Sequence, residues 1–201
     1  MKILLYGGTF DPPHKGHINL LKAAVKQIKP DRVIVMPAGT PPHKKASTTP
    51  ASLRLAMCSC FQQLGEQIQI SDWEISRRTK SYTIDTIQML QKQFTNAEIY
   101  LCIGSDMLES FETWKDWQTI VQTCTLVAHC RDVAEQKQFE AAAEYLTQKG
   151  AKLVLLTADV VLQASSSLRL QMQQGADPET ILPLEAAKIA QQYCLYQNRG
   201  K

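Results

Sequence analysis

Two histidines near the amino terminus, His14 and His17, have the type and spacing expected of a phosphate-binding site. They are three positions apart, directly before a helix that the sequence predicts from about Ile18, and side chains at this spacing lie on one side of a helical turn. The amino end of a helix offers backbone N–H groups and a partial positive charge to an anion. Gly16, between the histidines, has no side chain to hinder close approach. The pattern predicts a cradle for phosphate groups.

The histidines end a longer run, GGTFDPPHKGH from Gly7 to His17, which follows a short apolar segment. Gly7 and Gly8 allow a sharp turn and let a ligand contact the backbone, and the two prolines stiffen the path to the histidines. The run matches neither the Walker loop, G-x-x-x-x-G-K-[ST], nor the dinucleotide-binding G-x-G-x-x-G. A His-x-x-His pair also occurs in metal sites, so a metal-dependent hydrolase stays open as an alternative.

The rest of the sequence predicts the elements that position this run. Short apolar segments typical of strands buried on both faces occupy residues 3–6, 32–36, 98–103, 125–128 and 152–156, and residues 68–70 form a weaker edge candidate. Apolar residues recur at helical spacing within 21–28, 53–64, 82–94, 134–149 and 184–193. Alternating strands and helices indicate right-handed crossovers and a parallel sheet. We predict an α/β fold, a doubly wound Rossmann-like parallel sheet with helices on both faces.

Polar residues, glycine and proline gather where the predicted strands end. They occupy residues 7–17, 37–45 and 104–106, and Lys44 lies in the second of these segments. In a doubly wound sheet, ligands bind beyond the carboxyl ends of the strands, where the chain order reverses. We therefore expect one site at this edge of the sheet.

The composition limits the remaining classes of protein. The chain has 201 residues, with 22 Lys+Arg against 19 Asp+Glu and a formal net charge of +3, an excess too small to indicate a nucleic-acid binder. The first apolar run is too short for a secretory signal, and no apolar run has the length of a membrane span. The 6 cysteines contain no C-x-x-C pair. We expect a cytoplasmic protein with reduced thiols that binds neither nucleic acid nor membrane.

The run GGTFDPPHKGH resembles the signature of the nucleotidylyltransferase superfamily, whose hallmark is [HT]-x-G-H, and in particular that of the bacterial nicotinate-nucleotide adenylyltransferases. Further matches cover nearly the whole chain: Pro41–Lys44, Ser81–Thr86, Ile103–Asp106, Phe111–Trp114 and Ser165–Arg169. The resemblance implies a single nucleotidylyltransferase domain over residues 1–201, with a small C-terminal helical portion from about residue 165. It also implies transfer of the adenylyl group of ATP to nicotinate mononucleotide, which releases pyrophosphate and gives the deamido precursor of NAD.

The resemblance implies catalytic roles for His14, His17, Lys44 and Arg169. In this reaction a 5′-phosphate oxygen attacks the α-phosphorus of ATP in line, so positioning and charge stabilisation carry the catalysis. The two histidines would donate hydrogen bonds to the α- and β-phosphates as pyrophosphate leaves. Lys44 would fold over the triphosphate, and Arg169 would hold the β- and γ-phosphates. We expect Mg²⁺ to be held mainly through the ATP phosphates, with no metal bound by the protein itself.

The implied ATP subsite combines residues at strand ends and helix starts: Gly7, Gly8, Thr9, Phe10, His14, His17, Gly104, Asp106, Ser165, Ser166 and Arg169. Gly104 lets the base approach the strand end, and the Asp106 carboxylate accepts hydrogen bonds from ribose hydroxyls, or else caps a helix. The serine hydroxyls are expected to cap the N–H groups of their helix and to meet phosphate oxygens. The family segment usually reads I-S-[ST]-[ST]-x-[IL]-R, and this chain has Ala164 in place of the first serine.

The implied mononucleotide subsite contains Gly8, Lys44, Tyr82, Thr83, Trp114 and Lys115. Trp114 is the candidate to stack on the cationic pyridine ring, an interaction of about 0.5–2 kcal/mol; a buried core tryptophan is the alternative. Backbone N–H groups near Thr83 and Lys115 are the implied donors to the nicotinate carboxylate. The charge of Lys115 would favour an acid over an amide.

Several alternatives stay open from the sequence. A related adenylyltransferase would use nicotinamide mononucleotide or phosphopantetheine as the acceptor. A protein that kept the fold without catalysis would be a nucleotide sensor. The sequence also leaves open whether copies of the chain form a homo-oligomer.

Overall fold

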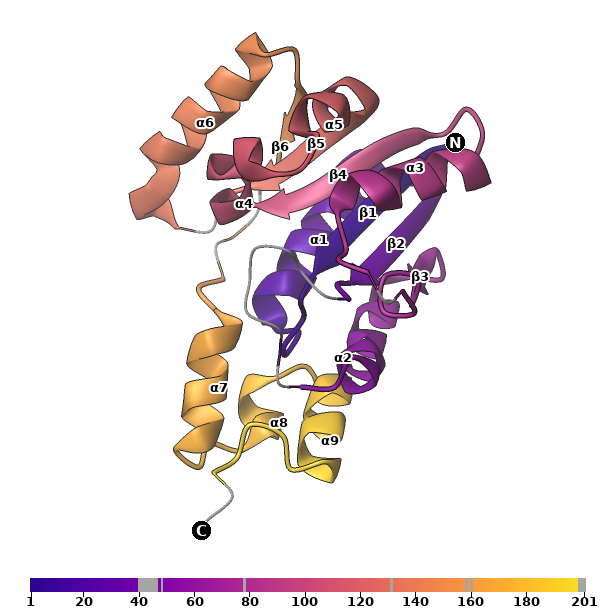
Figure 1. Ribbon diagram of the computed structural model, residues 1–201. Helices are drawn as coiled ribbons and strands as arrows, with labels where there is room; N and C mark the ends of the chain where they lie inside the picture. Colours follow the sequence, from indigo (N-terminus) through magenta and orange to yellow (C-terminus); the bar gives the residue numbers. More distant parts are fainter. Residues whose placement is uncertain are drawn as a thin grey trace.

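The computed structural model describes residues 1–39, 47, 49–77, 79–130, 132–157, 159 and 161–198. Within these ranges the chain forms a parallel sheet with the strand order β3-β2-β1-β4-β5-β6 (Figure 1). The strands are β1 (Lys2–Gly8), β2 (Arg32–Pro37), β3 (Ile68–Ile70), β4 (Glu98–Gly104), β5 (Cys124–His129) and β6 (Lys152–Leu155). The order reverses between β1 and β4, as in a doubly wound fold. The predicted fold class is confirmed, and residues 68–70 form one of the two edge strands.

The middle residues of the central strands are apolar because both faces of the sheet are covered. In β1, Ile3 and Leu5 pack into one hydrophobic cluster, whereas Leu4 and Tyr6 pack into another on the opposite face. Leu5 pairs with Ile34 of β2 and with Leu101 of β4. Burial on both sides fixes the register, since a slip of one residue would exchange the two faces.

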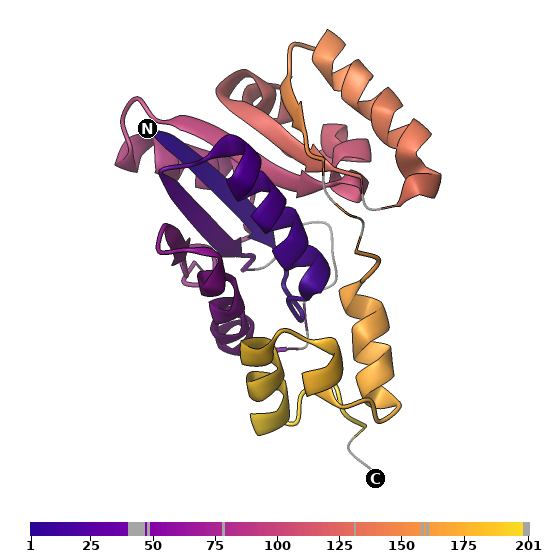
Figure 2. The ribbon, with the colours of Figure 1, turned by 180° about the vertical axis from the view of Figure 1, so that it is seen from behind.

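Helices cover both faces of the sheet. The α-helices are α1 (Lys15–Ile28), α2 (Ala51–Met57), α3 (Thr83–Gln93), α4 (Ser105–Glu109), α5 (Trp117–Thr123), α6 (Gln136–Gln148), α7 (Ser165–Gln173), α8 (Pro178–Ile181) and α9 (Leu184–Gln192), and the 3₁₀ helices are η1 (Cys58–Leu64), η2 (Phe111–Thr113) and η3 (Val133–Glu135). Figure 1 shows α3, α5 and α6 on the near face, and Figure 2 shows α1 on the opposite face. None of the helices in the described ranges is long and apolar enough to span a membrane.

The single helix expected over residues 53–64 is divided into α2 and η1. Side chains take up backbone carbonyls at this point: the Ser59 hydroxyl donates to the Ala56 oxygen at 2.8 Å, and the Gln63 amide donates to the Cys60 oxygen at 2.8 Å. Such local bonds compete with the α-helical pattern and favour a tighter turn. Periodicity also missed α4, α5 and α8, because each is too short to repeat an apolar spacing.

The C-terminal helices α7, α8 and α9 lie beyond the carboxyl ends of the strands (Figures 1 and 2). They form a small hydrophobic cluster in which Leu168 and Met172 of α7 and Ala186 and Ala190 of α9 pack with Met57 of α2. All of these side chains are buried. This packing places the amino end of α7 at the edge of the sheet where β1 ends.

Candidate active site

A cleft of about 1090 Å³ lies at the carboxyl ends of β1 and β4, where the strand order reverses. Its lining includes every predicted site residue except Lys44: Gly7, Gly8, Thr9, Phe10, His14, His17, Tyr82, Thr83, Gly104, Asp106, Trp114, Lys115, Ser165, Ser166 and Arg169. Lys44 lies outside the described residues. The fold therefore brings the residues of both predicted subsites into one cleft.

His14 and His17 cap the amino end of α1 and fix each other's orientation. The Nδ1 atom of His14 accepts from the backbone N–H of His17 at 3.4 Å, and the Nδ1 atom of His17 accepts from the backbone N–H of His14 at 3.2 Å. The two rings stack with their centroids 3.7 Å apart. A neutral imidazole that accepts at Nδ1 carries its proton at Nε2. We therefore assign the Nε2–H tautomer to both rings.

The first turn of α1 uses backbone N–H groups that the sequence suggested would be open to an anion. Lys15 donates to the Gln163 side-chain oxygen at 3.1 Å, Ile18 donates to the His14 carbonyl at 3.1 Å, and His17 donates to the His14 ring. Two of the N–H groups expected to face an anion, those of Lys15 and His17, are therefore already bonded within the protein. The sequence could not reveal it because Gln163 is distant along the chain. At this helix the two imidazoles add side-chain donors to the cleft.

Two residues give the histidine pair its support. A Cβ atom on Gly16 would lie 3.1 Å from atoms of the His14 ring and 3.2 Å from the Val161 carbonyl oxygen, so glycine permits this close packing. Phe10 is buried beneath the site, and its ring centroid lies 5.2 Å from that of His17 in an edge-to-face arrangement. Both contacts hold the imidazoles in place.

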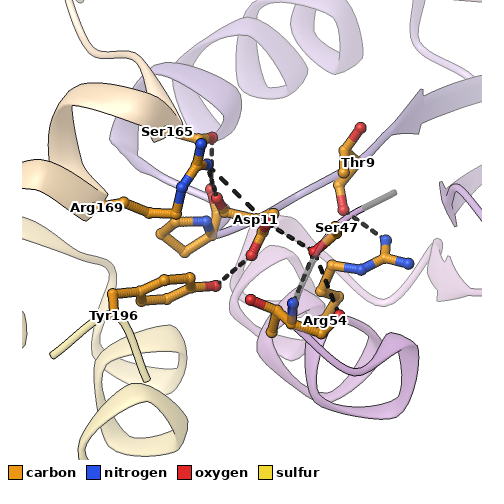
Figure 3. A network of polar contacts seen from close by, with 9 residues as sticks. Thr9, Asp11, Ser47, Arg54, Ser165, Arg169 and Tyr196 are labelled. Carbon is orange, nitrogen blue, oxygen red and sulfur yellow. Dashed lines mark hydrogen bonds and ion pairs between the residues drawn. The ribbon is translucent and has the colours of Figure 1, made fainter. Parts of the chain in front are cut away.

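The amino end of α7 approaches the same cleft without a side-chain cap. Its N-cap residue is Ala164, which makes no side-chain hydrogen bond. The Ser165 hydroxyl donates to the Pro12 carbonyl at 2.9 Å instead of capping the helix, which corrects that expectation for this serine. Arg169, one turn later, donates from Nη1 to the Asp11 carbonyl at 2.6 Å (Figure 3). These bonds join α7 to the segment between β1 and α1.

Gly104 and Asp106 lie at the junction of β4 and α4. Gly104 is the N-cap residue, and Asp106 lies within the first turn, so Asp106 is not the N-cap that the alternative interpretation required. Asp106 lines the cleft. A carboxylate in the first turn of a helix is favoured by the helix dipole. The Asp106 carboxylate thus lines the cleft at the end of β4, where the sequence predicts an acceptor for ribose hydroxyls.

Aromatic and cationic side chains form the other end of the cleft. The Trp114 ring stacks on the buried Phe111 ring, with centroids 5.0 Å apart, and Trp114 is half-buried and lines the cleft. The Lys115 ammonium lies 4.6 Å from the centroid of the Tyr82 ring. Trp114 therefore packs against the core and also borders the cleft. The predicted mononucleotide subsite draws on residues 82–83 and 114–115, and the contact between Lys115 and Tyr82 brings these two segments together.

Two further buried residues, Glu74 and His129, lie at or beside the cleft, and no sequence motif marks them. Glu74 is buried, lines the cleft and accepts from the Thr86 hydroxyl at 2.6 Å. Burial raises the pKa of this carboxyl, and the bond from Thr86 opposes the shift. Buried His129, the last residue of β5, lines a small cavity beside His14 and His17. In the sequence it directly follows the strand predicted over residues 125–128, which was an available signal.

Arg54 of α2 is a buried charge that joins two strand ends. It is 2% exposed, and its guanidinium donates to the Thr9 carbonyl at 2.8 Å (Figure 3). It also donates to the Gly39 carbonyl at 3.4 Å. Burial lowers the pKa of Arg54, and the charge of Asp11 opposes this shift. In the sequence, Arg54 is one arginine among the apolar residues of a predicted helix, and no motif marks it as a site residue. These bonds fix the segments that follow β1 and β2.

The described part of the chain contains no group of three or more His, Cys, Asp or Glu side chains placed to hold a metal ion. Structural and catalytic metal sites usually take three or four protein ligands.

Comparisons with known proteins agree with this geometry. The model of the cytidylyltransferase-like family matches residues 5–169, which include both histidines and end at Arg169. The chain belongs to this family. A protein of Neisseria gonorrhoeae named "Probable nicotinate-nucleotide adenylyltransferase" is 33% identical over 200 residues, covering 98% of each chain. A protein of the same name from Clostridium tetani is 29% identical over 198 residues, covering 98% of this chain and 99% of its own length.

These relatives place the chain among the nicotinate-nucleotide adenylyltransferases of the cytidylyltransferase-like family. A solved structure of Plasmodium falciparum nicotinic acid mononucleotide adenylyltransferase complexed with NaAD has a TM-score of 0.72 at 18% identity and covers 97% of each chain. At that identity the likeness concerns the fold. The family model ends within α7, whereas the two relatives are aligned over 98% of this chain, which includes α8 and α9.

Proposed function

We propose that this cytidylyltransferase-like protein transfers the adenylyl group of ATP to nicotinate mononucleotide, forming nicotinate adenine dinucleotide and pyrophosphate in NAD biosynthesis. The observation that carries the proposal is one cleft bordered by His14, His17, Arg169 and Trp114. It combines donors suited to a triphosphate with an aromatic surface suited to a pyridine ring. The names of the relatives support the same reaction.

The triphosphate would lie between the histidine pair and the amino end of α7. Ser165, Ser166 and Arg169 belong to that end of α7 and line the cleft. The backbone of residues 7–10 would line the path of the nucleotide, with Gly104 and Asp106 toward the adenosine. Lys44 would add a positive charge over the phosphates. Mg²⁺ would arrive with ATP as part of the substrate, held mainly by phosphate oxygens.

The histidines would act on the reaction itself. The 5′-phosphate of the mononucleotide attacks the α-phosphorus in line, the bond to the bridging oxygen breaks, and pyrophosphate leaves. Negative charge grows on the departing phosphates, so donors already aimed at that point lower the barrier without reorganisation. The Nε2–H groups assigned to His14 and His17 suit this role, since their Nδ1 atoms accept from the backbone.

The acceptor would lie against Trp114. Its indole, supported from behind by Phe111, offers a face to the pyridinium ring. Backbone donors near Thr83 and Lys115 would meet the nicotinate carboxylate, with Gly8, Lys44 and Tyr82 alongside. The Lys115 ammonium, 4.6 Å from the centroid of the Tyr82 ring, would lie next to this carboxylate, which supports a preference for the acid over the amide.

We also propose a setting for this activity. The chain would work in the cytoplasm as one nucleotidylyltransferase domain over residues 1–201, with the helical portion from about residue 165 completing the ATP subsite. ATP and nicotinate mononucleotide would be its partners, without nucleic acid or membrane.

The experiment that tests the proposal is a pyrophosphate-release assay with ATP and each of three acceptors: nicotinate mononucleotide, nicotinamide mononucleotide and phosphopantetheine. We expect turnover to be fastest with nicotinate mononucleotide. Equal rates for the acid and the amide would contradict acid selectivity. Absence of turnover with all three acceptors would favour a nucleotide sensor.

A substitution at Lys115 sharpens this test. Lys115→Gln should lower the preference for nicotinate over nicotinamide mononucleotide by about 3- to 10-fold, because a charge-assisted contact to the carboxylate is lost. Lys149→Gln is the matched control, since the Lys149 ammonium also lies over a tyrosine ring, 5.2 Å from the Tyr145 centroid, away from the cleft. An equal change in both variants would remove Lys115 from the acceptor subsite.

A further inference from the structure

Asp11 is the centre of a polar network that joins the active-site segment to the C-terminus of the chain (Figure 3). Its Oδ1 accepts from the Tyr196 hydroxyl at 2.6 Å, and its Oδ2 accepts from the Ser47 hydroxyl at 2.7 Å. Its main-chain oxygen accepts from Arg169 Nη1 at 2.6 Å. Four segments that are distant in the sequence therefore meet at this aspartate.

The burial of Asp11 makes these contacts important. The residue is 8% exposed, and a buried carboxylate is costly unless hydrogen bonds and opposite charge compensate for lost water. Two hydroxyls bind its oxygens, and Arg169 Nη1 lies 4.0 Å from Oδ2. The carboxylate therefore holds each partner in place, and each partner in turn limits where the segment between β1 and α1 can lie.

Tyr196 comes from a turn after α9 that is itself docked to the helices. The Leu195 N–H donates to the Ala190 carbonyl at 2.8 Å, and the Asn198 side chain donates to the Gln173 carbonyl at 3.2 Å. Burial and the neighbouring charge of Asp11 raise the pKa of the Tyr196 phenol. The phenol therefore stays protonated at neutral pH and remains a donor to Asp11.

Arg169 is the point at which this network reaches the cleft. Its guanidinium has five N–H donors, of which Nη1 binds the Asp11 carbonyl, and its side chain is 36% exposed. It also lines the cleft. A guanidinium anchored at one edge presents its other donors in a fixed direction, which favours recognition of phosphate.

We propose that Tyr196 and Asp11 are positioning residues for ATP, which hold the Arg169 guanidinium toward the triphosphate and make the C-terminal turn part of the nucleotide site. This inference rests on the proposed function for the identity of the ligand. Tyr196 lies beyond the residues that the family model matches, so the family comparison gives it no role.

The test begins with equilibrium binding of ATP to the full chain, without an acceptor. Tyr196→Phe keeps the ring and removes the hydroxyl, and we expect the ATP Kd to rise about 5- to 20-fold, the effect of losing one bond to a charged group. Tyr193→Phe is the matched control, because Tyr193 is in the same turn and is 47% exposed. It should leave the Kd within about twofold of the wild-type value.

A double-mutant cycle with Arg169→Ala separates positioning from a general structural effect. If Tyr196 acts through Arg169, Tyr196→Phe should change the ATP Kd by less than about twofold once the guanidinium is absent. An unchanged Kd for the single variant, or equal losses with and without Arg169, would overturn the proposal. Pyrophosphate release is measured separately. If the wild-type protein binds ATP but shows no turnover, the proposed function is overturned. The double-mutant cycle still tests whether Tyr196 positions Arg169, because it depends on ATP binding alone.

Discussion

Helices α1 and α7 both begin at the nucleotide cleft, but they present different groups to it. At α1, the rings of His14 and His17 accept backbone N–H bonds, and Gln163 binds the N–H of Lys15. At α7, the N-cap residue is Ala164, and no side-chain bond caps the helix. The first helix thus offers imidazole N–H groups, whereas the second keeps backbone donors and the positive end of its dipole for an anion.

This difference suggests a division of labour along the triphosphate. Imidazoles with fixed tautomers, close to where the bond breaks, are most useful when charge develops in the transition state. The amino end of α7 and its arginine suit phosphates that carry charge in the ground state as well. We therefore expect changes at α1 to appear mainly in kcat and changes at α7 mainly in the affinity for ATP.

The largest effect is expected for His17→Ala. Loss of one preorganised donor should lower kcat by about 100-fold or more. The KM for ATP should change much less, because the α7 contacts remain. Steady-state pyrophosphate release checks this, with circular dichroism to confirm folding. Near-normal kcat in a folded variant would remove His17 from catalysis.

At α7, Arg169→Ala should show the opposite pattern. Loss of charge-assisted bonds to phosphate should raise the KM for ATP by about 10- to 100-fold, with a smaller fall in kcat and little change in the KM for the mononucleotide. The same assay, with each substrate varied in turn, measures these constants. If Arg169→Ala lowered kcat as much as His17→Ala, the proposal that α1 acts on kcat and α7 on ATP affinity would be contradicted.

Gly16→Ala tests the packing of the histidine pair without changing either imidazole. The added methyl would press on the His14 ring and on the Val161 carbonyl, each slightly more than 3 Å away. We expect kcat to fall by about 10-fold, while the free energy of unfolding changes by less than about 1 kcal/mol because alanine favours the helix. Steady-state kinetics measure kcat, and denaturant unfolding measures the free energy of unfolding. An unchanged kcat would mean that the His14 ring accommodates the methyl group without loss of function.

Ala164→Ser tests whether α7 lacks a cap. A serine at the N-cap position can accept from a free N–H group of the first turn, so the free energy of unfolding should rise by about 1 kcal/mol. We expect kcat to stay within about twofold of the wild-type value. Urea unfolding measures the gain, and a stability equal to that of the wild type would show that another group already satisfies this end of α7.

The smallest effect concerns the pH dependence of stability. Because the pKa of Tyr196 is raised above its ordinary value of 10.0 in the folded protein, the unfolded phenol ionises first as pH rises. Stability is therefore lost above about pH 10, and Tyr196→Phe should flatten this loss. Unfolding curves between about pH 8 and pH 11 compare the two proteins. Parallel curves would mean that the phenol is not held by Asp11.

The sequence predicted those parts of the molecule that depend on local patterns. The central strands were recognisable because Ile3 to Tyr6 are buried on both faces, and the run from Gly7 to His17 marked the end of β1. Helices as short as α4 and α8 left no periodic signal. Contacts between distant segments left no sequence signal either. Examples are the bond between Gln163 and Lys15 and the bond between Tyr196 and Asp11, which depend on how the helices and strands pack.

The tautomer of His14 and His17 in the folded protein tests the proposed role of the histidine pair most directly. Long-range ¹H–¹⁵N correlation spectra of histidine-labelled protein distinguish Nδ1 from Nε2 protonation. We expect both neutral rings to carry the proton on Nε2, with Nδ1 accepting from the backbone of α1. A proton on Nδ1 of either neutral ring would contradict this expectation, because that ring could not cap the helix and donate to phosphate as proposed.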